Sequence, residues 1–261
     1  MSSRSVRLFV SVTLASLACL FGLATGSAQR RQRAPRIPPD VLIIGSSSIN
    51  GALGRLIESE VLRAGMHPQR VGHSSSGLSR PDFFDWDAEI PNLGDLRSLR
   101  GIVIYMGGND AQAVRLRPSE LPPPAAGAAR ARRRDRAGEW IIWRNEAEWS
   151  ARYQARVTAF VSALCAGGAP RVIFLLPAQG ENEHWTERMT RIRNLQDAGT
   201  RATRCGVSVD PSAVRARPGS TADGVHLTGS GAHAVWDAVG ARILDQLRTA
   251  PAPAAAATPV R

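Results

Sequence analysis

Lysine is absent from this chain of 261 residues, and all 33 of its basic side chains are arginines. The formal net charge is +11. We interpret this charge as compositional bias carried on a solvated surface. The alternative is an anionic partner, which would be an acidic glycan, a membrane surface or a nucleic acid. No zinc-finger spacing, RNA-binding aromatic motif or base-reading basic helix accompanies the charge, so no nucleic-acid partner is expected.

Cysteine is scarce, with three residues at positions 19, 165 and 205. Their spacing fits no metal-binding motif, and no metal or organic cofactor is expected. Internal repeats are also missing. The length allows one good-sized domain, or at most two small ones, and a hydrophobic fraction of 43% is enough for a real core.

Long apolar runs are missing except at the N-terminus, where Leu8 to Ala24 follows Arg4 and Arg7. Small residues at 26–28 complete the order of a secretory signal, with cleavage near Ala28. The protein is therefore expected to be periplasmic or secreted. An uncleaved signal that anchors the chain in the inner membrane is the alternative, although the run is short for a spanning helix.

Composition divides the remaining chain into segments. A basic, proline-bearing linker is predicted at 29–38, and a disordered tail at 250–261. Residues 39–249 are predicted to form the folded domain. An Arg-rich stretch at 122–136 interrupts this domain and is interpreted as an insertion at the rim of the site.

Short apolar runs alternate with helical patterns along the domain. Strands are predicted at 41–44, 101–106, 171–176 and 206–209, with a weaker one at 70–73. Helices are predicted at roughly 50–64, 146–166, 186–204 and 230–248. This alternation indicates an α/β fold, a three-layer α/β/α sandwich around a flavodoxin-like, five-stranded parallel sheet.

Residue types that carry out catalysis in other proteins follow the predicted strands. They lie in GSSS (45–48), in SSSGLSRPDFFDW (74–86), in GGND (107–110) and in DGVHLTGSG (223–231). Ligand groups in open parallel sheets gather outside the carboxyl ends of the strands, so these four segments are expected to converge.

Three of these segments each supply one part of a nucleophilic site. Asp223 lies three residues before His226, a spacing that lets a carboxylate orient its own histidine as a general base. Asn109 offers an amide donor for a developing oxyanion. A serine at a strand-to-helix turn lies at the positive end of a helix dipole. Taken singly, these residues also fit a solvated Asp with a capping His, an Asx-turn and a serine N-cap.

Together, the four segments resemble the blocks of the SGNH (GDSL-type) serine hydrolases, over residues 41 to about 245. The resemblance assigns Ser47 as nucleophile, Asp223 and His226 as its triad partners, and Ser47, Gly77 and Asn109 as the oxyanion hole. The segment GLSRPDFFDW further resembles an envelope-associated bacterial branch that is catalogued as a domain of unknown function. The region from Glu148 to Arg156 resembles the same branch.

The first block departs from the family pattern. Ser46 stands where the family usually has Asp, and Ser48 where it has Leu. The usual Asp helps to hold this loop, and Ser46 carries no charge. A non-catalytic glycan-binding or envelope-scaffolding protein with a degenerate block is therefore one alternative reading.

The resemblance implies an exported esterase that removes a short, acetyl-like acyl group from an envelope or extracellular carbohydrate through an acyl-enzyme. Transfer of the acyl group to a sugar hydroxyl is the other catalytic alternative. The expected partner is an acylated carbohydrate or another ester. The sequence does not fix the oligomeric state.

Two further features lie outside these blocks. Cys165 and Cys205 each come at the end of a predicted helix that leads into one of two adjacent strands, so a disulfide at the amino end of the sheet is predicted. Trp140, Trp143 and Trp149 are interpreted as core or lid packing, with a sugar-binding face as the alternative.

Overall fold

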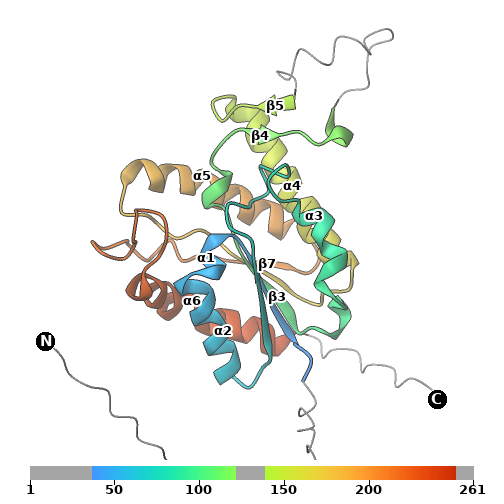
Figure 1. The fold of residues 1–261 in the computed structure, drawn as a ribbon, viewed down its shortest axis with the longest axis vertical. Helices are drawn as coiled ribbons and strands as arrows, with labels where there is room; N and C mark the ends of the chain where they lie inside the picture. Colours follow the sequence, from blue (N-terminus) through green and yellow to red (C-terminus); the bar gives the residue numbers. More distant parts are fainter. Residues whose placement is uncertain (1–36, 122–138, 251–261) are drawn as a thin grey trace, which may run out of the picture. The chain divides into compact units, whose positions relative to one another are not determined.

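The computed structural model describes residues 37–121 and 139–250. The predicted signal, most of the linker, the Arg-rich insertion and nearly all of the tail lie outside the described residues. The described chain forms a five-stranded sheet in the order β2-β1-β3-β6-β7, with parallel pairing throughout and helices on both faces (Figure 1). The predicted three-layer α/β fold is confirmed.

The sheet has five strands, and all but the partly exposed edge strand at Pro68–Gly72 form from short apolar runs. The strands are β1 (Val41–Gly45), β2 (Pro68–Gly72), β3 (Gly101–Tyr105), β6 (Val172–Leu175) and β7 (Gly206–Val209). β1 lies at the centre of three strands in register, and its last residue pairs with the last residue of β2 and of β3. Their carboxyl ends therefore meet at one edge of the sheet.

Four long helices of the described chain cover the sheet: α2 (Ala52–Arg63), α4 (Glu146–Ala166), α5 (Glu183–Arg201) and α6 (Gly229–Thr249). Successive strand residues point to opposite faces. Ile43 and Val103 therefore pack with α2 and α6, whereas Leu42 and Ile102 pack with α4 and α5. Both faces are apolar, which explains why the strands read as continuous hydrophobic runs.

Helix boundaries differ from the prediction in two places. The predicted helix at 50–64 is split into α1 (Ser47–Asn50) and α2, because Gly51 has an extended backbone with φ −84° and ψ −157°. α5 begins at Glu183 rather than 186, because the side chain of Asn182 caps it by accepting from the backbone N–H of Trp185.

Several short elements that were not predicted connect these strands and helices. They are α3 (Trp86–Glu89), the antiparallel pair β4 (Val114–Arg115) and β5 (Trp140–Ile141), and 3-10 turns at Ile90–Leu93, Leu96–Ser98, Gly108–Asp110 and Pro118–Glu120. Among residues 37–121 and 139–250, no helix combines the length and the apolar character that a membrane span needs.

Of the three tryptophans, Trp149 is buried, whereas Trp140 and Trp143 are half-buried and pack against arginine side chains. Trp149 is fully buried and stacks on Tyr153, with ring centroids 5.0 Å apart. The guanidinium of Arg191 lies over the ring of Trp143, and that of Arg115 over the ring of Trp140. The packing interpretation therefore describes them better than a sugar-binding face.

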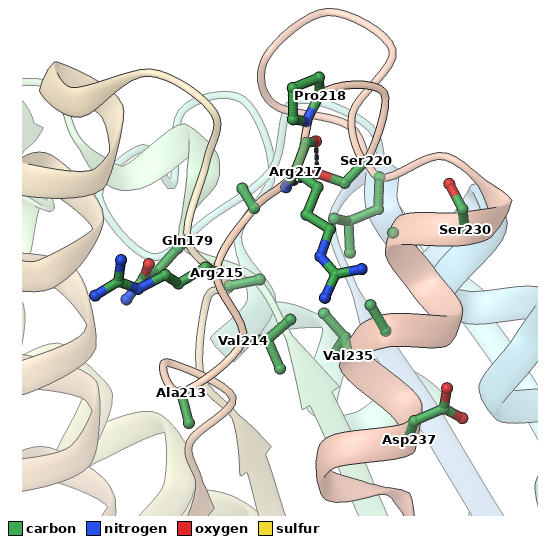
Figure 2. A pocket seen from close by; sticks show the side chains of 15 residues that line it. Gln179, Ala213, Val214, Arg215, Arg217, Pro218, Ser220, Ser230, Val235 and Asp237 are labelled. Carbon is green, nitrogen blue, oxygen red and sulfur yellow. Dashed lines mark hydrogen bonds between the residues drawn. The ribbon is translucent and has the colours of Figure 1, made fainter.

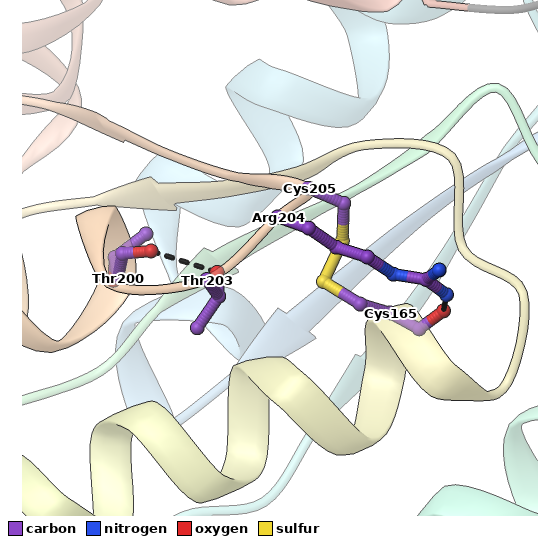
Figure 3. Close-up of a disulfide and its surroundings, with 5 residues drawn as sticks. All are labelled: Cys165, Thr200, Thr203, Arg204 and Cys205. Atoms are coloured by element: carbon purple, nitrogen blue, oxygen red, sulfur yellow. Dashed lines mark hydrogen bonds between the residues drawn. A yellow bond between two sulfur atoms is a disulfide. The ribbon is translucent and has the colours of Figure 1, made fainter.

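A disulfide joins Cys165, in the last turn of α4, to Cys205, just before β7 (Figure 3). The Cα atoms are 5.8 Å apart. The neighbouring Arg204 donates a hydrogen bond of 2.6 Å to the carbonyl of Cys165. Both cysteines lie at the amino ends of β6 and β7, away from the loops that follow the carboxyl ends.

We predict that replacing both cysteines by alanine lowers the free energy of unfolding. The crosslink spans 40 positions, and the chain-entropy model gives a loss of about 4 kcal/mol. Guanidinium denaturation of the oxidised wild-type and double-variant proteins measures the difference. Reduced wild-type protein serves as the control and should resemble the variant. Equal stability with and without reductant would show that the bond contributes nothing.

Candidate active site

Ser47 lies at a turn that only glycine permits. Gly45 ends β1 with φ +154°, and a Cβ there would stand 2.0 Å from the carbonyl oxygen of Tyr105. The backbone N–H of Ser46 donates to the same carbonyl at 3.2 Å. These contacts fix the backbone against β3, and Ser47 becomes the first residue of α1.

Asp223 and His226 form a compact unit on the loop before α6. The Nδ1 atom of His226 lies 2.6 Å from Oδ2 of Asp223, and the other carboxylate oxygen accepts the backbone N–H groups of His226 and Val225. Gly224 permits this tight turn with φ +83°. The backbone N–H of His226, followed by its imidazole, lowers the pKa of Asp223 to about 2, so the carboxylate is ionised at neutral pH.

The serine and the histidine meet across 179 residues of sequence. Oγ of Ser47 lies 2.8 Å from Nε2 of His226. With Nδ1–H donating to Asp223, Nε2 is left as the acceptor for the serine proton. The three predicted triad residues are therefore in one continuous chain of hydrogen bonds.

A second set of contacts holds the histidine loop in place. Glu181, which follows β6, accepts hydrogen bonds of 2.7 Å from the backbone N–H and the hydroxyl of Thr221. On the other side of the histidine, Thr228 caps α6 by accepting from the N–H of Gly231. Glu181 was not among the predicted residues, because it acts on a segment 40 residues away.

Asn109 lies in the same pocket as Ser47 and His226. It belongs to the 3-10 turn after β3, which Gly107 enters with φ +139°. Its Nδ2 donates 3.0 Å to the carbonyl of Ser76, which orients the amide. An amide nitrogen carries two hydrogens, so one remains for a ligand.

Gly77 lies beneath this pocket rather than in its lining. It is buried, and a Cβ there would stand 2.3 Å from a carboxylate oxygen of Asp110, so only glycine fits. Its backbone N–H donates to no acceptor in the described part of the chain. The predicted role of Gly77 in the oxyanion hole stays a prediction.

Asp110 is fully buried and joins the loops of the site. It accepts from the backbone N–H of Ser79 at 2.7 Å and from the hydroxyl of Tyr153 at 2.9 Å. Gln196 on α5 donates to the same tyrosine and to the carbonyl of Met106. Burial raises the pKa of Asp110 to about 6.

α4 supplies a further support through Arg156. Its guanidinium donates to the carbonyls of Leu78 and Ser79 and forms a two-pronged ion pair with Glu120. The region from Glu148 to Arg156, which the sequence analysis named, therefore supports the loop that contains Gly77. This supporting role was not predicted, because it depends on contacts between distant segments.

The pocket above Ser47 is small. Its volume is about 30 Å³, and Trp185, Met189 and Val225 form its apolar walls. In residues 37–121 and 139–250, no group of three His, Cys, Asp or Glu side chains is placed to hold a metal ion.

The chain is similar to known proteins in sequence family and in fold. Residues 40–220 match the family model described as Protein of unknown function (DUF459). The chain belongs to this family. No curated protein matches it.

Several solved structures share the fold. An acetyl esterase mutant solved with an acetate ion matches with a TM-score of 0.53 and 13% identity, over 81% of this chain and 99% of that one. A carbohydrate esterase family 3 protein from Talaromyces cellulolyticus has a TM-score of 0.53 and 13% identity, over 82% and 100% of the two chains. An alpha/beta hydrolase enzyme from the metagenome of Lake Arreo has a TM-score of 0.53 and 14% identity, over 80% of this chain and 94% of that one. The DUF459 domain of this chain thus has the fold of the SGNH esterases.

We predict that Asp110 makes the protein less stable as the pH rises. Its folded pKa of about 6 exceeds the ordinary 3.8, so the stabilisation is complete below about 3.8 and is lost as the pH passes 6. The difference corresponds to about 3 kcal/mol. Denaturation from pH 4 to pH 7 should show a steeper fall for wild type than for Asp110→Asn.

Tyr153→Phe supplies an independent check on this assignment. Removing the hydroxyl donor destabilises the ionised carboxylate, so the pH at which stability is lost should move upward. If wild type and Asp110→Asn had the same pH dependence, the pKa of Asp110 would not be raised.

Proposed function

We propose that this protein is a serine esterase of the SGNH type that removes a short acyl group from a carbohydrate ester. The hydrogen-bonded chain from Ser47 through His226 to Asp223 carries the proposal. Its three residues come from two segments that are far apart in the sequence. A serine or histidine with a purely structural role does not require a hydrogen-bonded Ser–His–Asp chain. The fold shared with esterases supports the same reaction class.

The proposed reaction follows from the contacts of the three side chains. Ser47 attacks the ester carbonyl carbon as Nε2 of His226 takes the hydroxyl proton. Asp223 stabilises the imidazolium. His226 then gives the proton to the leaving alcohol, the C–O bond breaks, and an acyl-enzyme remains. Water, activated by the same histidine, hydrolyses it and releases the acid.

The tetrahedral intermediate needs donors for its oxyanion. The free hydrogen of Asn109 Nδ2 and the backbone N–H of Ser47, at the start of α1, are two of its donors in the proposal. The buried N–H of Gly77 is the third donor in the proposal. Donors that the fold already holds in place need no reorganisation when the charge develops.

The size of the pocket favours a short acyl group. A volume of about 30 Å³ closed by Trp185, Met189 and Val225 has room for only a few atoms. The similar structures described as an acetyl esterase and a carbohydrate esterase agree with an acetyl ester of a sugar. Transfer of the acyl group to a sugar hydroxyl would use the same acyl-enzyme.

Ser46 does not remove the basis for catalysis. Its side chain lacks the charge of the usual Asp, but its backbone N–H and carbonyl bind Tyr105 and Ile49, and these contacts position Ser47. This favours an active enzyme over a glycan-binding scaffold with the same fold.

We also propose that the enzyme acts outside the cytoplasm. The signal-like order of the first 28 residues supports export. The disulfide between Cys165 and Cys205 supports an oxidising compartment.

We predict that a fluorophosphonate labels Ser47. The serine oxygen displaces fluoride from phosphorus when His226 removes its proton, so a stoichiometric adduct should map to this residue by mass spectrometry. Labelling should disappear in Ser47→Ala and in His226→Ala and persist in Ser48→Ala, the matched neighbouring serine. A folded wild-type protein that takes up no label would overturn the proposal.

We predict that Asn109→Ala lowers kcat for p-nitrophenyl acetate by about 10²–10³-fold, because one oxyanion donor is lost. Asn50→Ala is the matched control. Asn50 also donates through Nδ2 to a backbone carbonyl, that of Gly72, but it does not line the pocket. An equal loss of kcat in both variants would indicate a structural effect rather than an oxyanion hole.

A further inference from the structure

A second, much larger cavity lies beside the pocket of Ser47. It has a volume of about 760 Å³ and lies between the loop after β7 and helix α6 (Figure 2). The loop contributes residues 213–218 and Ser220, and the helix contributes Ser230, Val235 and Asp237 among others. None of the triad residues lines it. A space of this size has the volume of a typical ligand site.

The cavity and the catalytic pocket share a wall. Ala178, Gln179 and Leu227 line both spaces. Leu227 directly follows the triad histidine, and Ala178 and Gln179 follow β6. The two spaces are therefore adjacent, with these three residues at their common boundary.

The cavity is cationic and lacks a built-in partner for its charge. Arg217 extends from the loop into the space in front of Val235, whereas Arg215 leaves the loop on the other side (Figure 2). Asp237 is the single carboxylate of the lining, and in Figure 2 it points away from Arg217. Neither arginine forms an ion pair with a carboxylate of the described residues.

Hydrogen bonds with Ser220 hold the backbone of Arg217 in place. Ser220 accepts from the N–H of Arg217 at 3.0 Å and donates to its carbonyl at 2.6 Å. The adjacent Thr221 is held by Glu181, the same carboxylate that supports the histidine loop. The guanidinium is thus carried by a loop that is tied to the active site, although its side chain has no partner.

We propose that this cavity binds the alcohol part of the ester substrate, and that Arg217, with Arg215 at the rim, selects a carbohydrate that bears an anionic group. This inference rests on the proposed function for the position of the ester. The amide of Gln179 donates one hydrogen to the carbonyl of Ser212, so its second hydrogen and its oxygen remain to bind sugar hydroxyls. Val214, Leu227 and Val235 offer apolar contact for the faces of sugar rings.

Size and charge distinguish the two parts of the substrate. The small pocket beside Ser47 suits a short neutral acyl group, whereas the large cationic cavity suits the larger alcohol. A carboxylate on a uronic acid and a phosphate on a polyol both pair with a guanidinium. The common chemistry is an oxyanion on the leaving alcohol, and the two sources are separated by experiment.

Equilibrium binding tests the cavity without depending on catalysis. Ser47→Ala protein is titrated with an oligogalacturonide, with the same oligosaccharide after reduction of its carboxyl groups, and with an oligo(glycerol phosphate). We expect at least one anionic probe to bind about tenfold more tightly than the reduced saccharide. The preference should shrink as salt is raised, because the contact is solvent-exposed. The tighter anionic probe identifies carboxylate or phosphate as the source.

Arginine variants connect binding to this cavity. In the Ser47→Ala background, Arg217→Gln should remove most of the preference and Arg215→Gln a smaller part. Arg242→Gln is the matched control, an exposed arginine on α6 outside the lining of the cavity, and should keep it. Equal binding of all three probes, or a preference that Arg217→Gln leaves intact, would overturn the inference.

Kinetics with the Ser47 enzyme separate this inference from the proposed function. Acetylated forms of the acidic saccharide and its reduced counterpart are compared by kcat/KM, with p-nitrophenyl acetate as a third substrate. Turnover of all three without an acidic preference would reject the cavity and keep the esterase. Tight anionic binding without turnover of any ester would reject the esterase while supporting an anion-binding cavity.

Discussion

The arrangement of the site depends on the hydrogen bonds that the buried carboxylate of Asp110 accepts. Removing a charge from water is costly unless donors replace the water. Ser79 and Tyr153 supply those donors, and each belongs to a different segment. The carboxylate therefore determines where the loop of Gly77 must lie relative to the 3-10 turn. Asn109 is the adjacent residue of that turn, so its amide is positioned by a group that never touches the substrate.

Much of the fold follows from local pattern. Apolar runs marked β1, β3, β6 and β7 because both faces of the sheet are covered, and helical spacing marked α4 and α6 almost to the residue. The split at Gly51 was missed, because a glycine within a helical pattern does not reveal its backbone angles. The pair β4 and β5 was missed because two-residue strands leave no periodic signal, and because 25 positions separate the paired residues Arg115 and Trp140.

The candidate site divides in the same way. Asp223 and His226 were identifiable because their interaction is local, within three residues. Ser47 was identified through the resemblance to the SGNH hydrolases, because three serines in a row do not distinguish the nucleophile by composition alone. Glu181, Gln196 and Arg156 were not identified, because each supports a segment far away in the sequence. The larger cavity was beyond reach for the same reason, since it is formed by two segments that the fold brings together.

The disulfide has a consequence for the integrity of the chain. Cys165 and Cys205 close a covalent ring that contains β6 and α5, and therefore Glu181 and Gln196. A single peptide-bond cut inside this ring, for example in the exposed turn at 181–184, leaves both halves of the protein in one molecule. The ring therefore lets the chain survive one such cut without its two parts separating.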